Sequence, residues 1–138
     1  MNTGQTTPLR VLIADDCPEV RSAIRLLLEN QNGEWKITGE AEDVNGLRKA
    51  IATQNADLIL LDWELPGLQL LSQENFSVRD LVNSLKSSGI PLFVVAFSGF
   101  FEARQQAKAA GVDAFVSKIE PPENFLNILK SVEQLSGA

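Results

Sequence analysis

The chain has 138 residues, of which 44% are hydrophobic, and this predicts one domain with a single core. Its net charge of −6 excludes the basic surface that nucleic acids and anionic membranes attract, and no apolar run is long enough to span a bilayer. A single cysteine, Cys17, excludes an internal disulfide, and the absence of histidine removes the usual zinc ligand and general base. No segment resembles a secretion signal, so we expect a cytoplasmic protein.

Residues 1–9 are mostly polar and contain a proline, which predicts a flexible leader, and we expect one folded domain over residues 10–138. From Arg10 onward, short runs rich in Val, Ile, Leu and Phe alternate with segments of helical period. This alternation is typical of βα units around a parallel sheet, and five units can be counted.

The predicted elements follow one another along the chain. Strands are expected near residues 10–14, 35–41, 58–62, 92–98 and 114–118. Five helices are expected. The first has its inner face at Val20, Ile24, Leu27 and Leu28, the second at Leu47, Ala50 and Ile51, and the third at Val78, Leu81, Val82 and Leu85. The fourth spans residues 101–110, and the fifth begins near Pro122 with Phe125, Ile128, Leu129 and Val132 on its inner face. Asn32-Gly33, Ser88-Gly89 and Gly111 are expected to end the first, third and fourth helices.

The connector after Gly67, LQLLSQENF, is longer than most βα loops. Two interpretations remain open: a lid or partner contact, or an early helical turn that packs Leu68, Leu70 and Leu71, which the apolar spacing favours.

Four predicted strands end on a polar side chain. Asp15 and Asp16 follow the first, Asp62 ends the third, Ser98 the fourth and Lys118 the fifth. In a parallel sheet these side chains emerge at one edge, where open α/β proteins bind ligands. Carboxylates beside a hydroxyl and an ammonium are typical of a site for magnesium and phosphate.

Each of these residues also has an ordinary structural interpretation. Asp15 and Asp16 precede Pro18, where an aspartate commonly caps a helix, and Asp62 is placed for a turn. Lys118 is suited to guard a sheet edge, and Ser98 to bond its own backbone. The functional interpretation therefore depends on the set as a whole, with Asp62 as a nucleophile for phosphoryl groups.

The ordered set DD, LLDWELPG, AFSG and AFVSK resembles the receiver domains of two-component response regulators, over roughly Arg10 to Leu135. The branch it resembles most is that of receivers attached to helix-turn-helix (LuxR-type) transcriptional regulators. The resemblance implies a flavodoxin-like (βα)5 α/β fold with strand order 2-1-3-4-5.

The resemblance also implies the roles of the acidic residues. Asp62 would be the phosphoacceptor, which takes its phosphoryl group from a histidine kinase. Asp16, Asp62 and the backbone carbonyl of Glu64 would bind Mg²⁺, and Asp15 would hold a metal-bound water.

By the same resemblance Ser98 would be the hydroxyl switch, Lys118 the conserved-type lysine and Phe115 the aromatic switch. Phosphorylation would then alter the face formed by the fourth helix, fifth strand and fifth helix, which could also form a homodimer and control an output such as transcription. A core role for Phe115 is equally compatible with its sequence position.

Two features depart from the family pattern. Ile119 and Glu120 stand between Lys118 and the first proline, so a cis bond after the lysine is not favoured. Bulky Phe100, together with Glu64, would flank the path of the hydrolytic water, so we hypothesise that both residues tune the lifetime of the phosphate.

Three functional classes are therefore distinguished. The first is a phospho-accepting receiver that is not an enzyme in its own right and leaves nucleic-acid binding to another segment. The second is a pseudo-receiver that binds partners without phosphorylation, which the intact acids and Lys118 disfavour. The third is a flavodoxin-like enzyme, which the lack of a glycine-rich phosphate loop disfavours.

Overall fold

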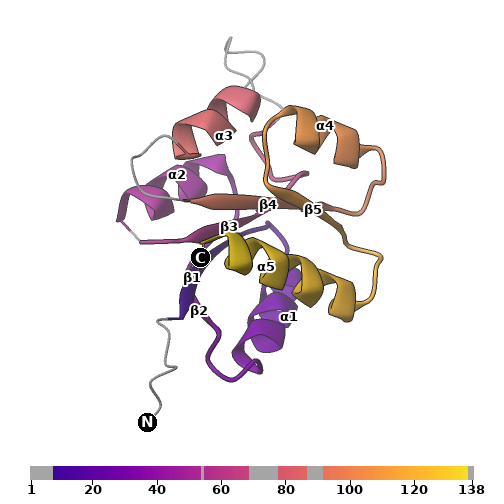
Figure 1. The fold of residues 1–138 in the computed structure, drawn as a ribbon. Coiled ribbons are helices and arrows are strands. Elements are labelled where there is room, and N and C mark those ends of the chain that lie inside the picture. Colours follow the sequence, from indigo (N-terminus) through magenta and orange to yellow (C-terminus); the bar gives the residue numbers. More distant parts are fainter. Residues whose placement is uncertain (1–7, 54, 69–77, 87–91, 137–138) are drawn as a thin grey trace.

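A computed structural model describes residues 8–53, 55–68, 78–86 and 92–136. Five parallel strands form one sheet in the order β2-β1-β3-β4-β5, which confirms the predicted topology (Figure 1). The strands are β1 (Leu9–Ala14), β2 (Trp35–Ala41), β3 (Leu58–Asp62), β4 (Phe93–Ser98) and β5 (Ala114–Ser117).

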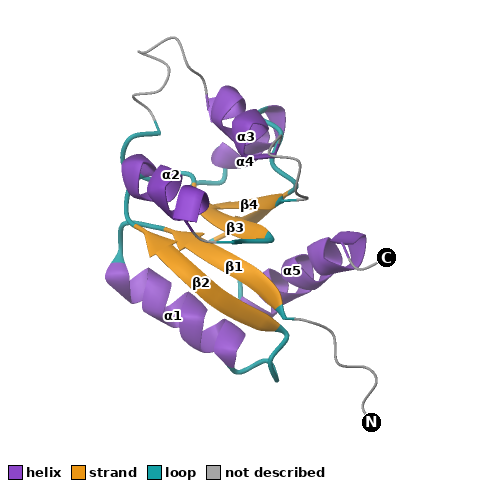
Figure 2. Ribbon diagram, turned by 90° about the vertical axis from the view of Figure 1, so that its left-hand side faces the viewer, coloured by secondary structure: helices purple, strands orange, loops and turns teal. Residues whose placement is uncertain are grey.

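Helices cover both faces of the sheet, as expected for parallel strands with crossover connections. They are α1 (Pro18–Glu29), α2 (Val44–Thr53), α3 (Val78–Lys86), α4 (Ala103–Ala109) and α5 (Pro122–Ser136). α1 and α5 lie on one face, and α2, α3 and α4 lie on the other (Figures 1 and 2).

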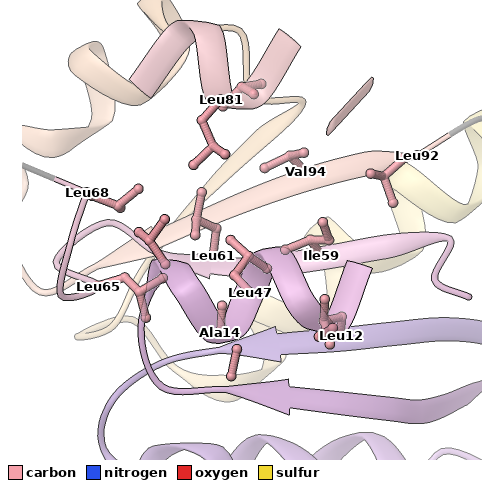
Figure 3. Packing of buried hydrophobic residues seen from close by; sticks show 14 residues of the cluster. Leu12, Ala14, Leu47, Ile59, Leu61, Leu65, Leu68, Leu81, Leu92 and Val94 are labelled. Carbon is pink, nitrogen blue, oxygen red and sulfur yellow. The ribbon is translucent and has the colours of Figure 1, made fainter. Parts of the chain in front are cut away.

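The strands divide the core into two layers because successive side chains point to opposite faces. In β1, Val11 and Ile13 pack toward α1 and α5, whereas Leu12 and Ala14 pack toward α2 and α3. Figure 3 shows the second layer, where Leu47 of α2 meets Leu12, Ile59 and Leu61 of the sheet. Burial on both faces explains why these strands are almost wholly apolar.

Several element ends differ from the sequence-based expectation. β1 begins at Leu9, one residue earlier than expected, because the Leu9 N–H bonds the Glu34 carbonyl at 3.0 Å. α1 ends at Glu29, before the Asn32-Gly33 pair expected to end it. α4 begins only at Ala103, since Phe101 lies in a turn.

Gly111 ends α4 as predicted. Its φ of +99° is left-handed, its N–H bonds the Lys108 carbonyl, and the next N–H, of Val112, reaches back to Ala107. These two bonds form a Schellman motif, in which glycine is favoured because it has no Cβ to clash.

The connector expected to act as a lid or a packed turn lies mostly outside the described residues. Its first residue, Leu68, is buried beside Leu65, which agrees with a packing role for that one side chain (Figure 3).

An ion pair joins two strands at the end of the sheet where the strands begin. The Arg10 side chain donates to Asp57 through Nε at 3.0 Å and Nη2 at 2.9 Å, and its backbone N–H donates to the same carboxylate at 2.8 Å. Asp57 immediately precedes β3, so the pair sets the alignment of β1 and β3.

None of the described helices has the length and apolar character needed to cross a membrane.

Candidate functional site

Three carboxylates meet at the end of the sheet where the strands finish, which we call the carboxyl edge. Asp15 and Asp16 follow β1 and Asp62 ends the adjacent β3, so their spacing in the sequence becomes proximity in the fold. One carboxylate oxygen from each residue lies within 4.8 Å of the other two. Asp15 and Asp62 are buried, at 0% and 1% exposure, and Asp16 is exposed.

Lys118 supplies the positive charge of this cluster. Its Nζ lies 3.1 Å from Oδ1 of Asp62 and 3.2 Å from Oδ2 of Asp15. It also lies 4.9 Å from the centre of the Phe97 ring, whose face attracts a cation. The ammonium therefore bridges two buried carboxylates.

Burial and neighbouring charges shift the pKa values of Asp62 and Lys118. Burial raises the pKa of Asp62 to about 6, although the Glu64 backbone N–H and Lys118 favour its ionised form. Burial also disfavours the charged form of Lys118, but the carboxylates of Asp62 and Asp15 outweigh this and raise its pKa. Three acids against one lysine leave the cluster short of positive charge.

Asp15 is not the helix cap that its position suggested. Pro18 fills the first helical position, so Cys17 is the N-cap residue of α1. Asp15 Oδ1 instead accepts the Cys17 N–H at 2.7 Å in a tight turn before the helix. Asp15 Oδ2 is buried, and it pairs with Lys118 Nζ at 3.2 Å without the geometry of a well-formed hydrogen bond. A buried carboxylate oxygen that is held by an ion pair, next to two further carboxylates, suits a hard divalent cation such as Mg²⁺.

Ser98 lies at the same edge, but its hydroxyl does not bond Asp62. The buried Oγ accepts the Phe100 N–H at 2.9 Å, which is the backbone bond that the sequence suggested. The hydroxyl donates to Glu64 Oε2 at 2.6 Å, and the Glu64 N–H donates to Asp62 Oδ1 at 3.0 Å. Glu64 therefore links the serine to the central aspartate, which the sequence analysis did not foresee.

Backbone hydrogen bonds extend the sheet pairing into the site. The Lys118 N–H donates to the Ser98 carbonyl at 2.8 Å, and the Trp63 N–H donates to the Phe97 carbonyl at 2.8 Å. The strand pairing thus continues one residue beyond the ends of β3 and β5. No cis peptide bond occurs among the described residues, including the Lys118-Ile119 bond.

Phe115 lies on β5 with its side chain buried, at 5% exposure, among Ala96, Ala103 and Ala107 beneath α4. Its packing role is therefore present in the structure. The side chain already lies in the core beneath α4.

An apolar groove that sequence patterns did not reveal lies beside the site. The groove has a volume of about 490 Å³ and lies between α1 and α5, with Lys118 at its rim. Leu26, on α1, lines it and is 63% exposed. A large apolar residue outside the predicted inner face of α1 was the signal that could have indicated this surface.

Comparisons with known proteins agree with this geometry. The chain is 30% identical over 130 residues to the Fimbriae Z protein of Salmonella typhimurium, covering 94% of this chain and 58% of that protein. It is 29% identical to the phosphate regulon transcriptional regulatory protein PhoB of Pseudomonas aeruginosa, covering 92% of this chain and 52% of PhoB. The chain thus spans little more than half the length of these curated relatives.

Solved structures show the same fold. The isolated receiver domain of RcsB from Salmonella enterica, determined with the phosphomimetic BeF3⁻, superposes with a TM-score of 0.76 at 21% identity, covering 92% of this chain and 89% of that one. A LuxR-family response regulator from Aurantimonas gives a TM-score of 0.72 at 21% identity, with 91% and 84% covered. The model of the response regulator receiver domain family matches residues 11–130, and the chain therefore belongs to that family.

Proposed function

We propose that residues 10–138 form a cytoplasmic, phospho-accepting receiver that takes a phosphoryl group from a histidine kinase onto Asp62. The observation that carries this proposal is the meeting of Asp62 with Asp15, Asp16 and Lys118 within ion-pair and metal-ligand distance. Receiver domains are signalling modules, and the residues here suit that role.

In the proposed reaction a carboxylate oxygen of Asp62 attacks the phosphorus of a phosphohistidine. A phosphorus–oxygen bond forms, the phosphorus–nitrogen bond breaks, and the histidine nitrogen leaves with its electron pair. Lys118 would move from Asp62 Oδ1 toward the phosphoryl oxygens and offset their charge.

Mg²⁺ would be held by Asp16, Asp62 and the Glu64 backbone carbonyl, with Asp15 orienting a water ligand. When bound, it would supply the positive charge that the three acids lack and polarise the phosphoryl oxygens. The close approach of the three carboxylates supports this assignment.

The kinase is proposed to contact the groove between α1 and α5. Its phosphohistidine must come within bonding distance of Asp62, so the kinase surface must touch the rim that Lys118 shares with the groove. Leu26, an exposed apolar side chain that lines the groove, is suited to protein binding.

The output is proposed to be transcriptional control through a segment outside these 138 residues. PhoB is named a transcriptional regulatory protein, and RcsB has been solved in a complex with DNA. The net charge of −6 argues against DNA contact by this segment. Ser98 and Phe115 would relay the phosphorylation to α4, β5 and α5, where a homodimer could form.

Intact-mass measurement tests the proposal. The protein is incubated with acetyl phosphate, with and without Mg²⁺, as wild type and as Asp62→Asn. We expect a Mg²⁺-dependent phosphoryl adduct on the wild type and none on the variant. A wild type that forms no adduct would favour the pseudo-receiver, which binds partners without phosphorylation.

A further inference from the structure

The Ser98 hydroxyl has a single proton, and that proton is already committed. It is donated to Glu64 Oε2 at 2.6 Å, while Oγ accepts the Phe100 N–H. Ser98 is 0% exposed, so its Oγ has little access to bulk solvent. A hydroxyl bonded to a carboxylate at this distance makes a charge-assisted hydrogen bond, about twice as strong as a neutral one.

The same proton is needed elsewhere if Asp62 becomes phosphorylated. A phosphoryl oxygen would accept a hydrogen bond from Ser98 only if the hydroxyl left Glu64, because one proton makes one strong hydrogen bond. We propose that the Glu64 carboxylate is a latch that holds Ser98 in the resting position and opposes the phosphorylated state. This inference rests on the proposed phosphorylation of Asp62.

The surroundings of Glu64 provide room for its release. Its side chain lines a pocket of about 450 Å³ between the turn after β3 and α4, together with Trp63, Phe100 and Glu102. A freed Glu64 carboxylate can turn into this pocket.

The latch makes Glu64 a positioning residue that acts through Ser98. Its backbone N–H stays on Asp62 Oδ1 while its side chain competes for the serine proton. A phosphoryl group therefore has to displace a carboxylate, and the population of the switched state depends on the difference between these two acceptors.

A double-mutant cycle separates the latch from simple charge repulsion. Affinity for beryllofluoride with Mg²⁺ is measured in Glu64→Ala, Ser98→Ala and the double variant. With Ser98 present, we expect Glu64→Ala to bind about tenfold more tightly, which corresponds to about 1.4 kcal/mol. With Ser98 replaced, we expect the same change to have less than about a twofold effect.

Two further variants complete the design. Glu64→Gln retains an acceptor oxygen without the charge, so we expect an intermediate gain of about threefold, or about 0.65 kcal/mol. Glu102→Ala removes a carboxylate from the same pocket and should change affinity equally in both Ser98 backgrounds. Equal effects of Glu64→Ala in both backgrounds would overturn the latch, because only electrostatic repulsion would remain.

A measurement without metal or phosphate mimic keeps the two proposals distinguishable. Three-bond NMR couplings report the Ser98 χ1 angle, which we expect to be a single rotamer in the wild type and averaged in Glu64→Ala. Unchanged couplings would exclude the latch whatever the result with beryllofluoride. A wild type that binds no beryllofluoride would refute the proposed function, while the couplings would still decide whether Glu64 restrains Ser98.

Discussion

The two ends of the sheet differ in how well their charges are balanced. At the end where strands begin, one cation meets one anion: Arg10 and Asp57 share three hydrogen bonds and are 36% and 26% exposed. At the carboxyl edge three carboxylates lie close together, and Lys118 pairs with the two that are buried. Balanced charge holds strands together, whereas unbalanced buried charge weakens the fold and creates affinity for a cation.

The largest expected effect comes from removing the positive charge of the carboxyl edge. Lys118→Met leaves two buried carboxylates without a counter-ion, and we expect the free energy of unfolding to fall by about 3 kcal/mol in EDTA. Added Mg²⁺ should restore most of this loss, since it replaces the missing charge. Urea unfolding followed by tryptophan fluorescence measures both effects. Lys130→Met, at an exposed position on α5, should change stability by less than about 0.5 kcal/mol.

Asp62 is expected to make the fold less stable as pH rises. Its pKa of about 6 in the folded protein exceeds the value of about 3.9 in an unfolded chain, so its protonated form favours folding below pH 4. That contribution is lost as the pH rises through 6. In EDTA, Asp62→Asn should match the wild type near pH 4 and exceed it by about 2 kcal/mol at pH 7.5. Equal stabilities of the variant and the wild type at both pH values would contradict the destabilisation that we assign to unbalanced buried charge at this edge.

Asp57 is expected to respond to pH in the opposite direction. Hydrogen bonds from Arg10 hold the pKa of Asp57 below its usual value, so the stability it contributes is present above pH 4 and is lost as the pH falls through the lowered pKa. Because the pair is partly exposed, we expect Asp57→Asn to lower the free energy of unfolding by only about 1 kcal/mol at pH 7. The difference should shrink as the pH falls through the lowered pKa of Asp57, and beryllofluoride affinity should stay unchanged. A loss of affinity would show that the two ends are coupled.

A change in the groove between α1 and α5 is expected to slow phosphotransfer from a histidine kinase but not phosphorylation by a small-molecule donor. Leu26→Ser should slow phosphotransfer from a cognate histidine kinase about fivefold, with stability unchanged, because an exposed apolar contact is lost. Phosphorylation by acetyl phosphate should proceed at the wild-type rate. Phe101→Ser removes another exposed apolar side chain, at 71% exposure, away from the groove and serves as the control. Equal slowing by both variants would argue against docking in the groove.

The smallest expected effect concerns the lifetime of the phosphate. Phe100 is 61% exposed and stands two residues after Ser98, where its ring could obstruct an approaching water. Phe100→Ala should speed loss of the phosphoryl group about threefold, or about 0.65 kcal/mol in the barrier. Intact mass followed over time measures this rate, and an unchanged rate would refute the hypothesis.

Much of this fold could be predicted because apolar runs and strands coincide. The segments 35–41 and 58–62 begin and end as predicted, and the order 2-1-3-4-5 is observed. The predicted helix ends were less accurate. α1 ends at Glu29, before Asn32-Gly33, because the Asn30 and Gln31 N–H groups bond the Leu26 and Leu28 carbonyls and close the helix there. Lys118 between Asp15 and Asp62 was foreseen from the topology.

Other contacts could not be predicted from local patterns. The bond between Ser98 and Glu64 spans 34 residues and depends on the rotamers of both side chains. The groove depends on how far apart α1 and α5 lie, which the helical period of either segment does not specify. Sequence patterns thus placed the residues at one edge, while side-chain geometry decided which of them are paired.

The backbone bonds that continue past the strand ends have a consequence for speed. Because Lys118 is fastened to Ser98 and Trp63 to Phe97 by main-chain bonds, the first response at Asp62 needs only rotations about side-chain torsions. Such rotations move only a few atoms, whereas collective movements of helices take microseconds to milliseconds. Signal arrival at this domain would then be timed by encounter and chemistry, with the protein itself adding little delay.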